Sequence, residues 1–260
     1  MQKLSAVEKP WALITGGSRG LGLALARECA RKGYHLFLIA RTEEALRQAA
    51  DTLRAEGDGR VEILPLDLSR DDAVKEISCL LNKRGIVPQM WINNAGTATF
   101  ERFTHTTPEA EDQMIRLNIL SLTAMTRLAL SIMKQGHLIN VASTAAFIPG
   151  PGASLYYASK SFTLNLTLAV SHEQIKGTVA ISVLCPGPLE TEMLKMRGDK
   201  GKRAAFLIMS PQKAAHYTLK KALKGKRVII PGLLNQMMVS CARVLPLEWI
   251  AKIIARSNLR

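Results

Sequence analysis

The stretch from Trp11 to Gly22 reads W-A-L-I-T-G-G-S-R-G-L-G, an apolar run that leads directly into a glycine-rich turn. Residues 11–15 are typical of a buried strand, and residues 21–33 have helical spacing. The glycines at 16, 20 and 22 let the backbone turn tightly and approach a pyrophosphate, which the free N–H groups of the next helix would face. Such a turn is weak evidence alone, but its place after the first strand strengthens it.

Six further apolar runs alternate with helical patterns along the chain, at residues 35–40, 61–68, 89–96, 136–143, 178–187 and 226–232. The runs are almost continuously apolar, as in strands that are buried on both faces. Alternating strands and helices of this kind build a parallel sheet that is covered by helices. We therefore predict an α/β fold, a doubly wound parallel sheet of about seven strands with helices on both faces. One domain over residues 1–260 is the simplest arrangement.

The composition is that of a soluble globular protein, with 47% hydrophobic and 22% charged residues. The four cysteines, Cys29, Cys79, Cys185 and Cys241, are scattered, which argues against a metal site or a disulfide framework and favours a reducing compartment. The N-terminus has no apolar core for a signal peptide, and no apolar run reaches the ~18 residues that would span a bilayer. We expect a cytoplasmic protein without a bound metal.

The net charge of +14 is concentrated near the C-terminus. Residues 200–260 contain thirteen Lys and Arg but only one acid, Glu248. This segment forms either a solvated basic face or a surface that attracts an anion, such as a membrane, a nucleotide-bearing substrate or an acidic carrier protein. Nucleic acid is disfavoured as a partner, because aromatic residues do not interleave with the basic ones.

Tyr156 and Lys160 are four residues apart in S-L-Y-Y-A-S-K, so they share one face of the predicted helix. At ~4 Å and an effective dielectric constant of ~20, the ammonium would stabilise a phenolate by ~4 kcal/mol, or ~3 pKa units. A tyrosine shifted in this way could donate or accept a proton near neutral pH. Ser143, at the end of a preceding strand, could hold a carbonyl oxygen beside it. Tyr157 is the weaker candidate, because Ser161 stands four residues after it.

The end of the second predicted strand lacks the acid that holds the ribose 2′-hydroxyl in NAD-preferring dinucleotide folds. The sequence there is Ile39-Ala40-Arg41. Arg41 and Arg19 could instead flank a 2′-phosphate, which suits guanidinium groups. We therefore expect NADP(H), and we assign the nearby Glu43 and Glu44 to the first turn of the next helix.

Together, these motifs make the chain resemble the short-chain dehydrogenase/reductase superfamily from about residue 10 to about residue 230. The resemblance rests on the order and spacing of T-G-G-S-R-G-L-G (15–22), Asp67-Leu68, N-N-A-G (93–96), Asn118, Ser143, Tyr156, Lys160 and P-G-P-L-E-T (186–191). It implies a Rossmann-like fold and hydride transfer between a nicotinamide and a carbonyl or secondary alcohol carbon.

The resemblance also implies roles for individual residues. Ser143 would polarise the carbonyl, Tyr156 would transfer the proton, and Lys160 would assist the tyrosine and hold the nicotinamide ribose. Asn118 would bind a water molecule that relays protons. The implied cofactor-binding residues are Gly16, Ser18, Arg19, Gly20, Leu21, Gly22, Arg41, Asp67, Leu68, Asn94, Ala95, Gly96, Tyr156, Lys160, Pro186, Gly187, Leu189 and Thr191.

Two segments bear on the substrate. Residues 188–210 correspond to a substrate lid in the family and combine apolar residues such as Met193 and Phe206 with a basic cluster, while Phe100 and Phe103 lie in the segment 97–103. The tail, residues 232–260, reads as two short amphipathic helices and loosely resembles bacterial 3-oxoacyl and 17β-hydroxysteroid reductases. We expect a reductase of apolar ketones or acyl thioesters, with peripheral membrane contact as one use of the basic tail.

The sequence is compatible with other functions. The chain could be an NADP-dependent alcohol or amino-alcohol dehydrogenase that works in the oxidative direction, a non-catalytic dinucleotide sensor, or a basic adaptor for membranes or nucleic acid. The intact Ser143, Tyr156 and Lys160 argue against the sensor. Family members usually pair through their long helices, so we expect a homodimer or homotetramer.

Overall fold

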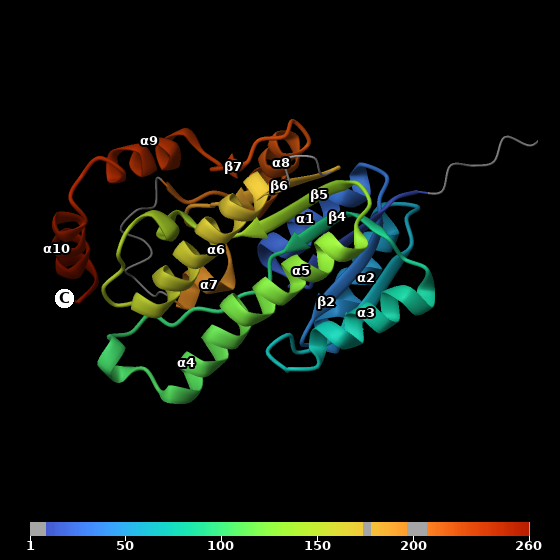
Figure 1. The fold of residues 1–260 in the computed structure, drawn as a ribbon, viewed down its shortest axis with the longest axis horizontal. Helices are drawn as coiled ribbons and strands as arrows, with labels where there is room; N and C mark the ends of the chain where they lie inside the picture. Colours follow the sequence, from blue (N-terminus) through green and yellow to red (C-terminus); the bar gives the residue numbers. More distant parts are fainter. Residues whose placement is uncertain (1–8, 174–177, 197–206, 260) are drawn as a thin grey trace, which may run out of the picture.

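The computed structural model describes residues 9–173, 178–196 and 207–259. Its strands form one parallel sheet in the order β3-β2-β1-β4-β5-β6-β7 (Figure 1). This confirms the predicted doubly wound α/β fold. The strands are β1 (Trp11–Thr15), β2 (His35–Ala40), β3 (Val61–Pro65), β4 (Pro88–Asn93), β5 (Gly136–Val141), β6 (Val179–Leu184) and β7 (Val228–Ile229).

The strands are apolar along their whole length because both faces of the sheet are covered. Successive side chains of a strand point to opposite faces. In β1, Ala12 and Ile14 pack into the core on one face, whereas Leu13 packs into the core on the other. In β2, Leu38 and Phe37 divide between the two faces in the same way.

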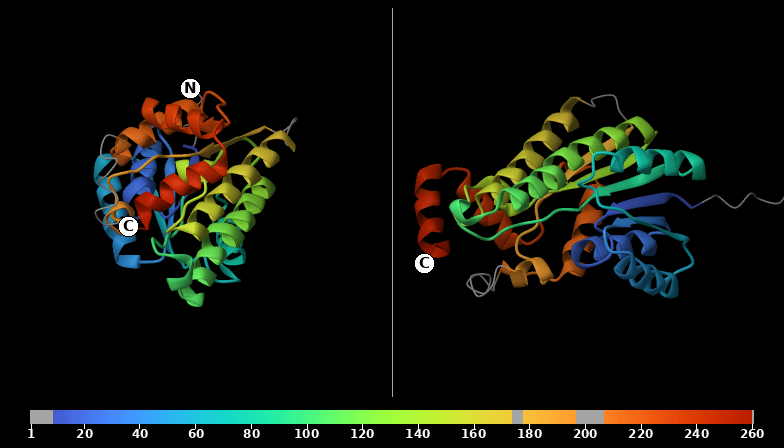
Figure 2. Two further views of the ribbon diagram at one scale, coloured as in Figure 1. Left: turned by 90° about the vertical axis from the view of Figure 1, so that its left-hand side faces the viewer. Right: turned by 90° about the horizontal axis from the view of Figure 1, so that it is seen from below.

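Helices form a layer on each side of the sheet (Figure 2). The first core contains side chains of α1 (Gly20–Arg31), α2 (Glu43–Glu56) and α8 (Pro211–Ala222). The second contains side chains of α3 (Ala73–Arg84), α5 (Leu122–Ile132) and α6 (Ser154–Glu173). The remaining helical segments are η1 (Phe103–His105), α4 (Pro108–Ile115), η2 (Arg116–Ser121), η3 (Thr144–Phe147), α7 (Glu192–Met196), α9 (Leu233–Ala242) and α10 (Leu247–Asn258).

The chain reverses its direction of progress across the sheet between β1 and β4. From β1 it proceeds outward to β3, and from β4 it proceeds outward to β7 on the other side. In open α/β sheets such a reversal leaves a crevice at the carboxyl ends of the strands. The segments that follow β1, β4, β5 and β6 therefore meet at this edge, and they carry most of the predicted site residues.

A continuous helix runs from Pro108 to Ile132 through α4, η2 and α5. Its central part, Arg116–Ser121, is π-helical, which the sequence analysis did not predict. By length and composition it is the one helix among the described residues that could cross a membrane. The α5 part packs against β4, β5 and α3, as a covering helix of the sheet does.

Ser69 lies shortly before α3 but does not cap this helix. The helix begins at Ala73, and Asp72 occupies the position before it. The Ser69 amide and hydroxyl instead donate hydrogen bonds to Asp67, at 2.9 and 2.7 Å. A short polar side chain here binds the preceding loop rather than the helix.

Gly136, at the start of β5, lies directly against the backbone of β4. Its φ of 114° is in the left-handed half of the map, and a Cβ atom here would lie 1.9 Å from the carbonyl oxygen of Gln89. We expect Gly136→Ala to lower the free energy of unfolding in urea by at least about 3 kcal/mol, through strain and a backbone shift.

The matched control is Gly33→Ala. Gly33 has a φ of 84° but nothing within 4 Å of its Cβ position, so the substitution should cost only the ~1–2 kcal/mol of a left-handed residue. Equal losses in both variants would show that the contact with β4 is unimportant.

Candidate active site

Ser143 lies just beyond β5, at the carboxyl edge of the sheet. It caps η3, because its hydroxyl oxygen accepts a hydrogen bond from the Ala145 amide at 3.1 Å. The hydroxyl also donates to the Pro186 carbonyl at 3.4 Å, which is a long contact. The side chain is half-buried, so the hydroxyl is oriented by the loop yet remains accessible.

Tyr156 and Lys160 lie on the buried face of α6, as the i, i+4 spacing predicted. The Lys160 Nζ atom is 5.8 Å from the centroid of the Tyr156 ring. The ring of Phe100 lies 6.0 Å from that of Tyr156, and Met114 joins the same apolar cluster. Tyr157 makes an edge contact with Tyr156, but its ring lies over Gly150, where a Cβ atom would be only 2.1 Å from it.

Lys160 is a buried cation. Only 6% of its surface is exposed, and burial lowers the pKa of its ammonium from 10.5 to about 8. The Nζ atom donates a hydrogen bond to the Val141 carbonyl at 3.1 Å, at the end of β5. The ammonium is therefore mostly protonated at neutral pH, and it is fixed beside the phenol by the strand that leads to Ser143.

Asn118 lies within the π-helical segment and is also buried, with 3% of its surface exposed. Its amide group donates to the Thr97 carbonyl and to the Ser159 hydroxyl, and its oxygen accepts from the Thr97 amide. A Cβ atom on Gly96 would lie 3.2 Å from the Asn118 oxygen and 3.3 Å from the Lys160 Nζ atom. Gly96 thus lets these two side chains approach the same point of the backbone.

The glycine-rich loop after β1 is held by the segment after β4. The Asn94 side chain donates to the carbonyls of Thr15 and Gly16, at 3.0 and 3.2 Å. The amides of Asn94 and Ala95 donate to the Thr15 hydroxyl. A Cβ atom on Gly22 would lie 2.0 Å from the Gly16 carbonyl oxygen, so only glycine fits this turn.

The start of α1 suits an anionic group. The helix has no side-chain cap and no acid in its first turn, so its first N–H groups are left for a ligand. Gly20, with a φ of 55°, faces Thr191, whose methyl group would lie 3.3 Å from a Cβ atom there. The residues present therefore fit the pyrophosphate of a dinucleotide.

The segment after β6 completes this edge. The Pro186 carbonyl accepts a hydrogen bond from the Thr144 amide at 2.9 Å, which ties the segment to the loop of Ser143. Gly187 packs directly on Asn235 of α9, whose oxygen would lie 2.4 Å from a Cβ atom. Leu189 forms a bridge with Met209.

The predicted arginines differ in their surroundings. Arg19 forms an exposed ion pair with Glu192 of α7, which sequence reasoning missed. Arg41 is exposed beyond β2, close enough to Asp67 to influence its ionisation. Burial raises the pKa of Asp67, but the hydrogen bonds from Ser69 and the charges of Arg41 and Arg70 outweigh burial and hold this pKa below its usual value.

The other predicted residues also lie along this edge. Leu21 and Leu68 are buried, and Ser18 and Ala95 are half-buried. Part of the predicted lid, with Arg197, Lys200, Lys202, Arg203 and Phe206, lies outside the described residues. Of the two predicted phenylalanines only Phe100 packs near Tyr156, whereas Phe103 is 59% exposed.

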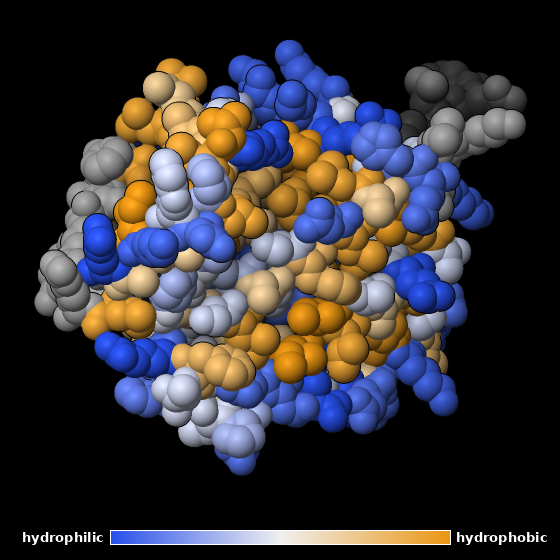
Figure 3. All heavy atoms as spheres, turned by 60° about the vertical axis from the view of Figure 1, so that its left-hand side comes forward, coloured by the Kyte–Doolittle hydropathy of each residue, from blue (hydrophilic) through white to orange (hydrophobic). Residues whose placement is uncertain are grey.

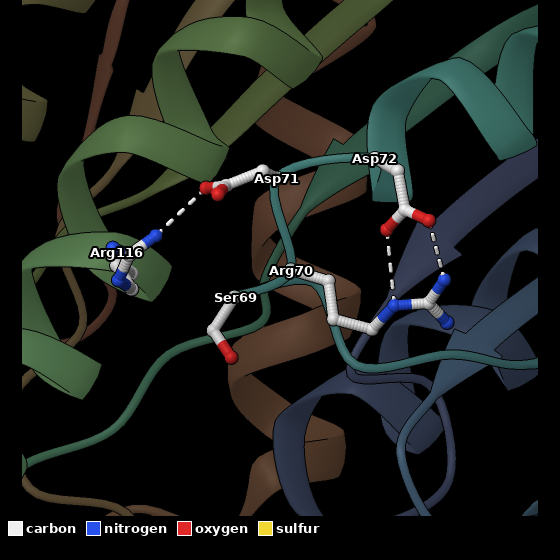
Figure 4. Close-up of a pocket in the computed structure, with 5 residues that line it drawn as sticks. All are labelled: Ser69, Arg70, Asp71, Asp72 and Arg116. Atoms are coloured by element: carbon white, nitrogen blue, oxygen red, sulfur yellow. Dashed lines mark hydrogen bonds and ion pairs between the residues drawn. The ribbon is translucent and has the colours of Figure 1, made fainter.

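A pocket of about 480 Å³ lies farther along the edge, beyond β3 (Figure 4). Its charged lining residues pair with one another: Arg70 with Asp72, and Arg116 with Asp71. Ser69 completes the lining, so none of the candidate catalytic residues contributes to it. The lining residues 69–72 directly follow Asp67 and Leu68 in the sequence. None of the lining residues belongs to the Tyr156 cluster.

Sequence reasoning missed several supporting residues. Thr15, Thr97 and Ser159 hold the loops of the site, and Met114 lines it. Thr15 stood within the quoted glycine motif and could have been found there. The others carry no local signal, because their partners are distant in the sequence.

The family assignment follows from comparison with known proteins. The sequence model of the family described as short chain dehydrogenase matches residues 10–202. The chain therefore belongs to this family, as the motifs predicted.

Two curated relatives illustrate its range. The chain is 33% identical over 207 residues to 17-beta-hydroxysteroid dehydrogenase type 3 of Mus musculus, a match that covers 75% of this chain and only 65% of the mouse protein's length. It is 34% identical over 194 residues to the granaticin polyketide synthase putative ketoacyl reductase 1 of Streptomyces violaceoruber, covering 71% of this chain and 70% of that protein.

Solved structures agree with the fold. A 7beta-hydroxysteroid dehydrogenase superimposes with a TM-score of 0.86 at 22% identity, over 95% of this chain and 96% of that one. A short-chain dehydrogenase from Sphingobium yanoikuyae, in complex with NADPH, has a TM-score of 0.77 at 28% identity, over 96% and 94% of the two chains.

The buried ammonium of Lys160 predicts a pH effect on stability. Because its pKa is about 8 when folded and 10.5 when unfolded, the unfolded chain binds more protons between these values, and this contribution to stability rises with pH. The unfolding free energy of the wild-type protein minus that of Lys160→Met should therefore rise by about 3 kcal/mol from pH 8 to 10.5.

Urea unfolding without added nucleotide at a series of pH values measures this difference. Taking the difference removes the contribution of Cys29, whose pKa burial raises to about 12 in both proteins. A difference that does not change with pH would mean that the Lys160 pKa is not lowered.

Proposed function

We propose that the chain is an NADP(H)-dependent oxidoreductase that transfers a hydride between nicotinamide and a carbonyl or secondary alcohol carbon. The observation that carries this proposal is the buried Lys160 ammonium, 5.8 Å from the Tyr156 ring centroid at the carboxyl edge of the sheet. Ser143 and Asn118 lie on the elements that surround this pair. Reduction of apolar or acyl-type ketones is the reaction that we assign.

The proton chemistry follows from these contacts. The Ser143 hydroxyl makes only a 3.4 Å contact with Pro186, so it can turn to donate to a substrate oxygen and polarise the carbonyl. Tyr156 donates its proton to that oxygen as negative charge develops there. The Lys160 charge then stabilises the phenolate, and the low exposure of both side chains strengthens this attraction.

Asn118 acts through its backbone in this scheme. Both amide hydrogens of its side chain are already used by Thr97 and Ser159. A π-helical turn displaces carbonyls from the regular hydrogen-bond ladder, so we place the relay water on the main-chain carbonyl of Asn118. This water would return a proton toward Lys160 and Tyr156 after each turnover.

The dinucleotide supplies the hydride when bound, and the chain positions it. The Gly16–Gly22 turn and the start of α1 would hold the pyrophosphate, with Ser18 and Leu21 beside it. Asp67, Leu68, Asn94, Ala95 and Gly96 would border the adenosine. Pro186, Gly187, Leu189 and Thr191 would hold the nicotinamide, and Lys160 its ribose.

Preference for NADP(H) rests on charge at the end of β2. The strand ends without an acid, and Arg41 is exposed next to it. Arg19 is paired with Glu192. While this ion pair is intact, Arg41 is the arginine that would meet a 2′-phosphate. The NADPH complex of the Sphingobium yanoikuyae relative supports the same choice.

An apolar substrate fits the surroundings of Tyr156. Phe100, Met114, Met193 and Ala145 pack in the same cluster. Such a lining favours a carbonyl attached to hydrocarbon, as in acyl chains or fused rings. The curated relatives, a hydroxysteroid dehydrogenase and a putative ketoacyl reductase, are named for substrates of this kind.

Subunit pairing belongs to this proposal. The outer side of α4, η2 and α6 exposes Ile115, Leu120 and Phe162, with exposures of 38%, 56% and 36%. Apolar side chains gathered on two neighbouring helices favour contact with a second copy. We therefore assign this face to a homodimer, and it shares no helix with the C-terminal elements α9 and α10.

Tyr156→Phe tests the chemistry. Without the phenolic oxygen there is no proton donor, so turnover of NADPH with a ketone panel should fall at least ~1,000-fold while the dissociation constant for NADPH stays within a few-fold. Absorbance at the nicotinamide band and fluorescence titration measure the two quantities.

Tyr157→Phe is the matched control, because it removes a neighbouring hydroxyl from the same helix. It should retain turnover. Comparable activity in Tyr156→Phe, or equal loss in both variants, would contradict the assignment.

Arg41→Ala tests cofactor choice. Loss of a charged hydrogen bond to a 2′-phosphate should raise the KM for NADPH by about 10- to 100-fold and leave the KM for NADH unchanged. Arg47→Ala, which removes an arginine from the exposed face of α2 where it pairs with Glu43, is the control and should change neither value. An equal effect of Arg41→Ala on both cofactors would refute the 2′-phosphate contact.

A further inference from the structure

The C-terminal helices carry an unusual number of exposed apolar side chains. We define the C-terminal apolar face by its eight large apolar residues, each between 45% and 81% exposed: Leu233, Leu234, Met237, Val244, Leu245, Leu247, Trp249 and Ile253. They come from α9, α10 and the short connection between them. Large apolar side chains that are exposed together on consecutive elements mark an interaction site.

Helix α9 turns one of its polar residues, Asn235, toward the body and several large apolar residues outward. Asn235 and Val239 are buried against the body, and Asn235 contacts Gly187. The opposite side presents Leu233, Leu234 and Met237, and no charged residue occurs between Leu233 and Ala242. A surface helix normally turns charged and polar residues to water, so this side of α9 is built for an apolar surrounding.

Helix α10 combines apolar and basic stripes. Ile250 is its buried contact, with 7% of its surface exposed. Trp249 and Ile253, one turn apart, form an exposed apolar stripe, while Lys252 and Arg256 form an exposed basic stripe next to it. Tryptophan with lysine and arginine on one outward side is typical of helices that lie in a lipid interface.

The face lies at the substrate side of the molecule. The Asn258 amide donates to the Pro151 carbonyl at 3.0 Å, and Arg102 donates to the Leu259 carbonyl at 3.1 Å. Arg243, between the helices, lies 5.0 Å from the Phe147 ring centroid. These contacts are to the loops that lead from Ser143 into α6 and that follow Phe100, so the C-terminal helices border the candidate active site.

We propose that the C-terminal apolar face docks on an anionic lipid bilayer and brings the active-site edge to its surface. The apolar side chains would enter the boundary between headgroups and acyl chains, and Arg243, Lys252 and Arg256 would pair with lipid phosphates. Figure 3 brings this end of the molecule forward and shows hydrophobic residues at the surface with hydrophilic ones among them. An apolar ketone dissolved in the bilayer would then reach the site without crossing water.

A second copy of the chain fits this face less well. A two-fold contact places the same surface on both sides, so the three basic residues of one copy would meet those of the other, with Glu248 as the single acid within the stretch 233–256. Like charges across an interface oppose association. Phospholipid headgroups supply the missing negative charge.

The first experiment uses the intrinsic fluorescence of Trp249. Of the three tryptophans, Trp91 is fully buried, Trp11 is half-buried and Trp249 is 62% exposed. Vesicles of equal parts phosphatidylcholine and phosphatidylglycerol should shift the emission to the blue, and brominated acyl chains should quench it. Trp249→Phe should lose the quenched signal. Quenching that is absent in the wild-type protein would overturn the proposal.

The second experiment compares variants by vesicle co-sedimentation. Leu247→Ser, Trp249→Ser and Ile253→Ser combined should weaken binding at least about a hundredfold, because three apolar side chains no longer enter the bilayer. Val87→Ser is the matched control: Val87 is 41% exposed, but it precedes β4 and so lies at the opposite edge of the sheet. An unchanged thermal unfolding midpoint shows that each variant is folded.

The charge arm identifies the lipid. Lys252→Gln with Arg256→Gln should weaken binding to the anionic vesicles by about tenfold or more and leave the residual binding to pure phosphatidylcholine unchanged. Equal binding of the wild-type protein to both vesicle types would overturn the anionic preference. If the triple serine variant instead lowers the oligomeric state in analytical ultracentrifugation and binds vesicles normally, the occupant is a second copy. Vesicle binding requires no turnover, so this proposal can fail independently of the proposed reaction.

Discussion

The site depends on one buried cation. Burial lowers the pKa of Lys160 by an amount equivalent to about 3 kcal/mol, and the fold accepts this cost because the Val141 carbonyl and the Tyr156 ring lie beside the ammonium. A charge that is poorly solvated in the resting protein gains more from a phenolate than a hydrated charge would. The poorly solvated Lys160 ammonium therefore stabilises the phenolate that forms when Tyr156 transfers its proton.

Holding this cation requires elements that are far apart in the sequence. Helix α6 supplies Lys160, β5 supplies its carbonyl partner, and the absence of a side chain at Gly96 lets Asn118 come close. The hydrogen bonds of Asn94 to Thr15 and Gly16 then join this region to the glycine-rich turn. A dinucleotide bound on that turn would reach Tyr156 only because β1 and β4 are neighbours at the point where the strand order reverses.

The accuracy of sequence reasoning varied with the range of the interaction involved. β1 and β2 have the predicted bounds, because strands buried on both faces need uninterrupted apolar residues. The pairing of Tyr156 with Lys160 also follows from helical geometry alone. The π-helical turn at Asn118 and the ion pair of Arg19 with Glu192 were missed. The two residues of the ion pair are 173 positions apart, so local spacing gives no sign of it.

The sequence by itself determined the parallel sheet, the glycine-rich turn and the shared helix face of Tyr156 and Lys160, because these depend on period, apolarity and backbone freedom within short segments. Only the tertiary structure decided that Lys160 is buried, that Asn235 backs Gly187, and that α9 and α10 turn apolar side chains outward. The amphipathic pattern of a helix states that it has two faces; which face meets the protein and which meets the surroundings is settled by the packing of the whole chain.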